Sequence, residues 1–277
     1  MLFFGTAGVP WNSKDRSTVS GIEALHRLNL ECLEMEFVQR VSMGEEAARS
    51  VKEKGSQLGI RLSVHAPYYI NLNSHDLEKR KASRKRLLDA ARVGYLCGAM
   101  DIVFHPGFYQ GNSPELTFQV IKQELLGIVE ELEKNRIRVT LRAETTGKHN
   151  QFGSLEETIR LAQEVPNLKP CVDFSHLHAR LQYHTGEDFL LDLERIEKML
   201  GKEALEEMHV HVSGMNYTKN GEKNHLNLAE SDFPYLFMLE ALHKKRVSGR
   251  IICESPNLEE DAILLKSRWL DIANHVI

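Results

Sequence analysis

Eight times along this chain, a short run of apolar and often β-branched residues is followed by a longer amphipathic segment rich in charge. This alternation is typical of repeated strand–helix units around a parallel sheet. We expect strands at residues 2–6, 32–37, 61–65, 101–105, 138–144, 170–174, 207–212 and 249–254. We expect helices at residues 18–27, 45–58, 76–97, 114–134, 155–163, 187–200, 232–243 and 258–273.

The count of eight units favours a closed (β/α)8 TIM barrel over a doubly wound open sheet, which has the same alternation. The length of 277 residues suits one such barrel, and no low-complexity linker divides the chain. We therefore expect a single domain over residues 1–277. In such a barrel, side chains at the carboxyl ends of the strands meet at one mouth, where barrel enzymes place their active sites.

Charge, cysteine content and apolar runs indicate which kinds of partner and cellular compartment to expect. The formal charge of -4 gives no global basic field for nucleic acid, so a polyanion would need a local positive site, which bound divalent metal ions could supply. The four cysteines are far apart, and we expect them to be reduced and mostly buried. The chain starts without a basic, apolar leader and has no run of about 20 apolar residues, so we expect a cytoplasmic protein without a membrane partner.

Residues of metal-binding type recur at the carboxyl ends of six successive predicted strands. Each could be a structural residue if taken alone, but the barrel would bring all six together. A buried ring of uncompensated acids costs several kcal/mol, and metal coordination is the usual remedy. Imidazole and carboxylate ligands without thiolate suit Zn²⁺ first, with Mn²⁺ possible. The six residues are His65, His105, Glu144, Asp173, His211 and Glu254.

The seventh predicted strand carries two histidines on one face, because side chains alternate along a strand. His211 lies nearer to the strand end than His209 and is the preferred ligand, with His209 as its competitor.

Several of these strand ends resemble the ordered motifs of the endonuclease IV family. They are the segments that begin at His65, His105, Glu144 and Asp173, together with Glu254. They read His-Ala-Pro-Tyr-Tyr-Ile-Asn-Leu, His-Pro-Gly, Glu-Thr-Thr-Gly and Asp-Phe-Ser-His. The resemblance spans the whole barrel. It implies a metal-dependent apurinic/apyrimidinic endonuclease of the xylose-isomerase-like group, which hydrolyses double-stranded DNA 5′ to an abasic site and leaves a 3′-hydroxyl in base excision repair. It also implies a monomer.

The resemblance implies two or three zinc ions. His65 and His105 would hold the first ion, and Glu144 would bridge it to a second. Glu144 and Glu254 would also orient or deprotonate the attacking water. The second ion would be held by Glu144, Asp173, His211 and Glu254.

A third ion would be held by His176 and His225, but the sequence departs from the family here. Lys223 stands where the family has a metal-binding aspartate. Glu222 could substitute if the loop is rearranged, or Lys223 could place a positive charge near the phosphate, and both hypotheses stay open.

Recognition of an abasic site requires a bent duplex and side chains that fill the space left by the missing base. Tyr68 and Tyr69 follow His65 and fit this role, although each could equally pack the barrel rim, and the resemblance adds Gln39 and Arg40. A basic cluster at residues 79–86 is more typical of a solvated helix face than of a phosphate site.

The main rival is a sugar isomerase or epimerase on the same barrel, which would use Glu144, Asp173, His211 and Glu254. It does not need the additional histidines at positions 65, 105 and 176, and this surplus favours the nuclease. A third hypothesis is a metal-holding or DNA-binding protein that has lost turnover through the Lys223 change.

Overall fold

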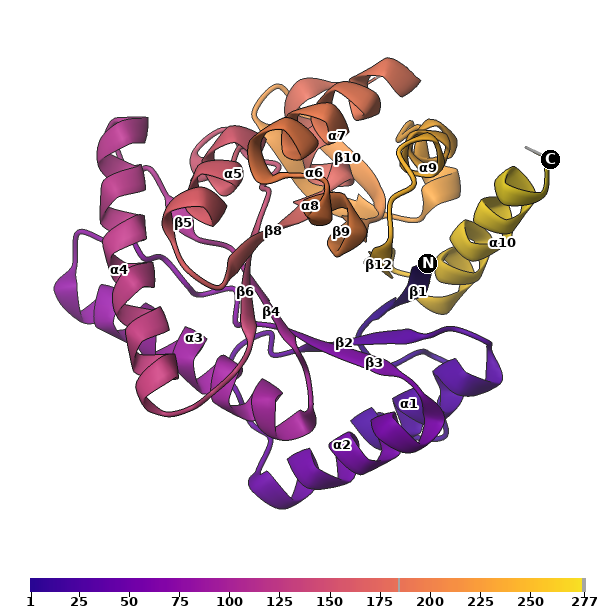
Figure 1. Ribbon diagram of the computed structural model, residues 1–277, viewed down its shortest axis with the longest axis horizontal. Coiled ribbons are helices and arrows are strands. Elements are labelled where there is room, and N and C mark those ends of the chain that lie inside the picture. Colours follow the sequence, from indigo (N-terminus) through magenta and orange to yellow (C-terminus); the bar gives the residue numbers. More distant parts are fainter. Residues whose placement is uncertain (184, 276–277) are drawn as a thin grey trace.

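The chain forms a closed barrel of parallel strands in the order β1-β12-β9-β8-β6-β4-β3-β2 (Figure 1). The computed structural model describes residues 1–183 and 185–275. The predicted TIM barrel is therefore confirmed, with strand ends within about two residues of those expected. The barrel strands are β1 (Leu2–Ala7), β2 (Cys32–Glu36), β3 (Arg61–His65), β4 (Asp101–Phe104), β6 (Thr140–Glu144), β8 (Leu168–Asp173), β9 (Met208–Val212) and β12 (Gly249–Cys253).

Helices surround the barrel and cover the outer faces of its strands (Figure 1). Several begin at a capping side chain: Ser17, Asp76, Ser113 and Ser154 each accept from a backbone N–H of the first turn. The outer helices are α1 (Thr18–Arg27), α2 (Glu45–Leu58), α3 (Leu77–Cys97), α4 (Pro114–Lys134), α5 (Leu155–Glu164), α7 (Gly186–Leu200), α9 (Tyr235–Lys244) and α10 (Glu259–His275).

The connections contain short elements that the sequence pattern does not predict. Two of them, the helix α6 and the hairpin β10–β11, follow β8 and β9 at the mouth of the barrel. They are too short to show a clear hydrophobic period. These elements are β5 (Gly107–Phe108), β7 (Gln151–Phe152), α6 (Phe174–Leu181), α8 (Glu203–Glu206), β10 (Gly214–Thr218), β11 (Gly221–Leu226) and the 3₁₀ turn η1 (Leu228–Glu230).

The interior of the barrel is polar. Glu34 of β2 contacts His209 and His211 of β9, and Asp101 of β4 contacts Arg250 of β12. These strands are not neighbours in the barrel, so the contacts cross its interior. Branched aliphatic residues usually fill this space in TIM barrels. The main apolar core lies instead between the strands and the outer helices.

The four cysteines are buried and free, as expected. Among the described residues, no helix is both long and apolar enough to cross a membrane.

Candidate metal centre

Glu144, at the end of β6, is the common partner of the histidines at the mouth. His65 Nε2 lies 3.0 Å from Glu144 Oε2, and His105 Nε2 lies 3.5 Å from the same oxygen. Glu144 Oε1 lies 3.1 Å from His176 Nδ1 and 3.5 Å from His211 Nδ1. One fully buried carboxylate therefore contacts the imidazoles of four chain segments.

The described residues contain four groups of potential ligand atoms, and within each group the atoms lie within 4.8 Å of one another. One group, Cys171, His209 and His211, extends below the mouth, and the other three lie at the mouth. Glu144 belongs to two groups and so joins them. The structure thus brings together all eight residues proposed as ligands and adds Glu222. The three groups at the mouth are His65, His105 and Glu144; Glu144, Asp173, His211 and Glu254; and His176, Glu222 and His225.

A β-bulge explains why Glu222, and not Lys223, completes the third group. In the hairpin β10–β11, Asn216 pairs with Asn224 and Tyr217 pairs with Glu222, which leaves Lys223 as the extra residue. The bulge turns Lys223 outward, where it is exposed. Glu222 Oε2 lies 3.5 Å from His176 Nε2. Of the two hypotheses for this loop, the geometry favours substitution by Glu222.

The two histidines of β9 occupy different levels. His211 Nδ1 faces the mouth, 3.4 Å from Glu254 Oε1. His209 lies one layer deeper, with Nε2 2.9 Å from Glu34 Oε2. The placement agrees with the preference for His211.

Backbone carbonyls orient three of the histidines. Nδ1 of His65 lies 2.8 Å from the Ala66 carbonyl, and Nδ1 of His225 lies 3.2 Å from the Glu254 carbonyl. Nδ1 of His176 similarly lies 3.0 Å from a carbonyl, that of residue 145. A ring whose Nδ1–H is held this way presents Nε2 as the metal-binding nitrogen.

The donor set fits zinc or manganese. Several buried polar atoms at the mouth make no hydrogen bond within the described part of the chain. Unsatisfied buried polar atoms are costly, and a bound cation would satisfy them. Imidazole and carboxylate donors are the ligands that Zn²⁺ and Mn²⁺ accept. The atoms are Glu144 Oε1, Asp173 Oδ2, Glu254 Oε2, His105 Nδ1 and His211 Nδ1.

The electrostatics also indicate a cation site. Burial raises the pKa of Glu254 to about 8; His211 opposes this shift, and the charges of Glu144 and Asp173 reinforce it. Burial opposes ionisation of Glu144 too, but the neighbouring histidines, His105 first, hold its pKa well below the usual range. Without a cation, the mouth therefore carries more carboxylates than it can keep ionised near neutral pH.

The sequence pattern did not single out two acids on β2, the buried Glu34 and the partly buried Glu36. Tyr68 donates its hydroxyl to Glu36 Oε2 at 3.5 Å, and burial raises the pKa of Glu36 to about 8. The available signal was the strand itself, which reads Cys-Leu-Glu-Met-Glu. Two acids spaced by two residues share one face of a strand, and in a barrel strand that face is enclosed.

The four residues proposed to contact DNA lie on neighbouring loops beside the mouth. The Tyr68 N–H donates to the Val38 carbonyl, which joins the loop after β3 to the loop after β2. Gln39 and Arg40 are exposed on this second loop. Tyr68 is half exposed and packs on His65, with ring centroids 5.2 Å apart, whereas Tyr69 is 63% exposed.

The basic cluster at the start of α3 is largely paired with acids. Five of its cations contact carboxylates of α3, its N-cap residue or α4, as expected for a solvated helix face, whereas Arg86 donates to the Tyr69 carbonyl. These pairs are Lys79 with Asp76, Arg80 with Glu124, Lys81 with Glu78, Arg84 with Glu131, and Lys85 with Asp89.

Sequence comparison agrees with this architecture, since residues 22–272 match the xylose isomerase-like TIM barrel family. The chain belongs to this family. It is 46% identical over 267 residues to an uncharacterised protein of Methanocaldococcus jannaschii, covering 96% of each chain. It is also 28% identical over 208 residues to a probable endonuclease 4 of Acholeplasma laidlawii, covering 72% of this chain and 68% of that one.

Solved structures of this barrel group include both nucleases and sugar epimerases. Endonuclease IV from Thermus thermophilus superposes with a TM-score of 0.75 and 19% identity, covering 98% of this chain and 99% of that one. A D-tagatose 3-epimerase-like protein gives a TM-score of 0.72 and 20% identity, covering 98% of each chain. At these identities the likeness shows the fold alone.

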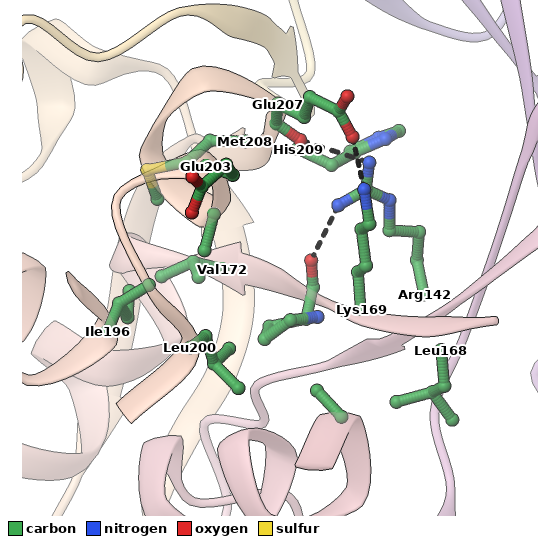
Figure 2. Close-up of a pocket in the computed structure, with 13 residues that line it drawn as sticks. Arg142, Leu168, Lys169, Val172, Ile196, Leu200, Glu203, Glu207, Met208 and His209 are labelled. Carbon is green, nitrogen blue, oxygen red and sulfur yellow. Dashed lines mark hydrogen bonds and ion pairs between the residues drawn. The ribbon is translucent and has the colours of Figure 1, made fainter. Parts of the chain in front are cut away.

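This xylose isomerase-like barrel also has a pocket at its opposite end, beside the amino ends of β8 and β9 (Figure 2). Much of its lining is apolar, and its cations are already paired. Arg142 Nη2 donates to the Glu207 carbonyl at 3.0 Å, and Lys169 contacts the Glu207 carboxylate. The amino ends of barrel strands usually serve stability, so the mouth remains the candidate active site.

Proposed function

We propose that this protein is a metal-dependent endonuclease that hydrolyses the phosphodiester 5′ to an abasic site in double-stranded DNA. One observation carries the proposal: three groups of potential metal ligands meet at the mouth, two of them sharing Glu144. Multi-metal sites of this kind suit phosphodiester hydrolysis. The relatives named probable endonuclease 4 support the same activity.

The chain's own groups can be assigned roles in this reaction. Bound zinc ions would act as Lewis acids and lower the pKa of a bound water. Glu254 borders the mouth and, while it ligates metal, would orient the attacking water and accept its proton. Glu144, fully enclosed, holds the surrounding imidazoles in place. The water oxygen bonds to phosphorus as the P–O3′ bond breaks, and the departing O3′ takes up a proton from solvent, so the products are a 3′-hydroxyl and a 5′-phosphate.

A nicking assay on a duplex with one abasic analogue tests this proposal. We expect nicking 5′ to the analogue, its loss after chelation and its return with zinc. Glu254→Gln should remove the activity. Ketose turnover without nicking would support a sugar isomerase, for which Glu144, Asp173, His211 and Glu254 alone form a sufficient group. Tight binding of the duplex without cutting would instead support a protein that has lost turnover.

Metal analysis tests the role of Glu222. The purified protein should carry three equivalents of zinc, and Glu222→Ala should carry two, because it removes the carboxylate of the third group. Lys223→Ala is the matched control and should keep three, since this neighbouring side chain is exposed. Two equivalents in the wild type, unchanged in Glu222→Ala, would exclude a third site.

Tyr69 offers a test of the DNA contact. Stacking on a nucleotide contributes about 1–3 kcal/mol, so Tyr69→Ala should raise the Kd for the abasic duplex about tenfold. Fluorescence anisotropy with a labelled duplex measures this change. Met100 is similarly exposed, at 59%, but it precedes β4 at the opposite end of the barrel, so Met100→Ala should bind normally. Equal Kd values for both variants would exclude Tyr69 from the interface.

A further inference from the structure

Glu34 is an enclosed carboxylate that lies next to the proposed metal centre without belonging to any of its ligand groups. From β2 it reaches across the barrel to β9, where Oε1 lies 2.8 Å from His211 Nε2 and Oε2 lies 2.9 Å from His209 Nε2. Ser63 donates its hydroxyl to Oε2 at 2.7 Å. These contacts hold the carboxylate in one orientation, with Oε1 against His211.

The ring of His211 is oriented differently from the rings of His65 and His225, whose Nδ1 atoms lie against backbone carbonyls. Those rings present Nε2 to the mouth. His211 instead places Nε2 beside Glu34 and turns Nδ1 toward the mouth, 3.4 Å from Glu254 Oε1 and 3.5 Å from Glu144 Oε1. At His211, the Glu34 carboxylate therefore contacts the ring nitrogen that faces away from the mouth, as a backbone carbonyl does at His65 and His225.

We propose that Glu34 is a positioning residue that selects Nδ1 of His211 as the metal-binding nitrogen. A negative charge 2.8 Å from Nε2 stabilises a proton there, which leaves the Nδ1 lone pair for an ion shared with Glu144 and Glu254. A carboxylate partner also makes a ligating imidazole more basic and fixes its orientation. The proposal rests on the metal centre proposed above, but it holds for a nuclease and for a sugar isomerase alike.

A layer of opposite charges supports Glu34 from the amino end of the barrel. His209 Nδ1 lies 4.0 Å from Asp101 Oδ2, and Asp101 in turn contacts Arg142 at 2.6 Å and Arg250 at 2.8 Å. Charged and polar groups thus run from the arginines through Asp101, His209 and Glu34 to the mouth. The Glu34 carboxylate is therefore in contact with polar groups on both sides, Ser63 and His209 as well as His211.

Zinc titration of metal-free protein against a chromophoric chelator tests the proposal with Glu34→Gln, which keeps the size of the side chain and removes its charge. The zinc affinity of the group containing His211 should fall about 10- to 100-fold, the usual effect of losing such a partner. Zinc bound by His65 and His105 should be unaffected. Nitrogen NMR of the zinc-loaded wild type should show His211 bound through Nδ1 and protonated at Nε2, and Glu34→Gln should show a mixture of ring states.

Asp192→Asn is the matched control, because Asp192 is a buried carboxylate on α7 that contacts Tyr183 and Arg195. Its zinc affinities should equal those of the wild type. Unchanged affinity and an unchanged His211 ring in Glu34→Gln would overturn the role of Glu34, even if the variant were less stable. A wild type that binds no zinc would overturn the metal centre itself.

If Glu34→Gln does not fold, Ser63→Ala provides the test, since it removes only the hydroxyl that helps to hold Oε2. A smaller loss of zinc affinity in the same direction is expected. No change in affinity and no change in the His211 ring signals would overturn the proposal.

Discussion

Glu144→Gln is expected to lower the rate of metal-dependent nicking of an abasic duplex by at least ~10³-fold, at the upper range for a group that acts directly on the reaction. The expected effect is large because Glu144 contacts four histidines and belongs to two of the ligand groups. An amide at this position removes the negative charge that both groups share. Single-turnover nicking with saturating enzyme measures the loss without interference from DNA binding.

Glu157→Gln is the matched control for this experiment. Glu157 is also a buried glutamate, but it caps α5 and accepts from Tyr109 and the backbone of Gly153. Its variant should lose some stability and keep the nicking rate of the folded protein. Nicking by Glu144→Gln within tenfold of the wild type, at normal zinc content, would refute the central role of Glu144.

Asp101→Asn is expected to lower the free energy of unfolding by about 3–5 kcal/mol, the cost of removing one partner from a buried ion pair. Asp101 is 3% exposed and contacts both Arg142 and Arg250, so its loss leaves the buried Arg142 and the partly buried Arg250 without their counter-charge. Urea denaturation of wild type and variant measures the difference. A difference below about 1 kcal/mol would show that other groups neutralise these arginines.

The pH dependence of this difference has a definite sign. Burial opposes ionisation of Asp101, but Arg142 and Arg250 outweigh it and lower its pKa to about 2. An acid whose pKa is lower in the folded state contributes stability above its unfolded pKa of about 3.9 and loses that contribution as the pH falls towards 2. The advantage of wild type over Asp101→Asn should therefore shrink between about pH 4 and pH 2.

Asp192→Asn should show the opposite trend. Burial raises the pKa of Asp192 to about 6, although Tyr183 and Arg195 oppose the shift. A raised pKa means that the contribution of this acid is present below pH of about 4 and is lost as the pH rises through 6. The stability of wild type relative to this variant should therefore fall between about pH 4 and pH 7.

The sequence predicted the barrel and its mouth well because both follow from periodic patterns. His65, Glu144 and Asp173 stand at the ends of regular strands, and the barrel topology alone brings such positions together. His225 and His176 were identified through resemblance to a family, since they lie in the hairpin strand β11 and the short helix α6, where no period marks them.

The place of Glu222 in the site depends on an irregularity of the backbone. Glu222 enters the third group only because the bulge at Lys223 changes which side chains share a face of the hairpin. A one-residue insertion of this kind has no signature in hydrophobic periodicity.

The sequence by itself determined the eight strand–helix units, the residue types at their carboxyl ends and hence a mouth rich in imidazole and carboxylate. Only the tertiary structure decided that Glu34 faces His209 and His211 across the barrel, and that Asp101 lies between two arginines. The physical reason is that side-chain alternation specifies which face of a strand is enclosed, whereas barrel closure and the stagger between strands decide which enclosed side chains meet.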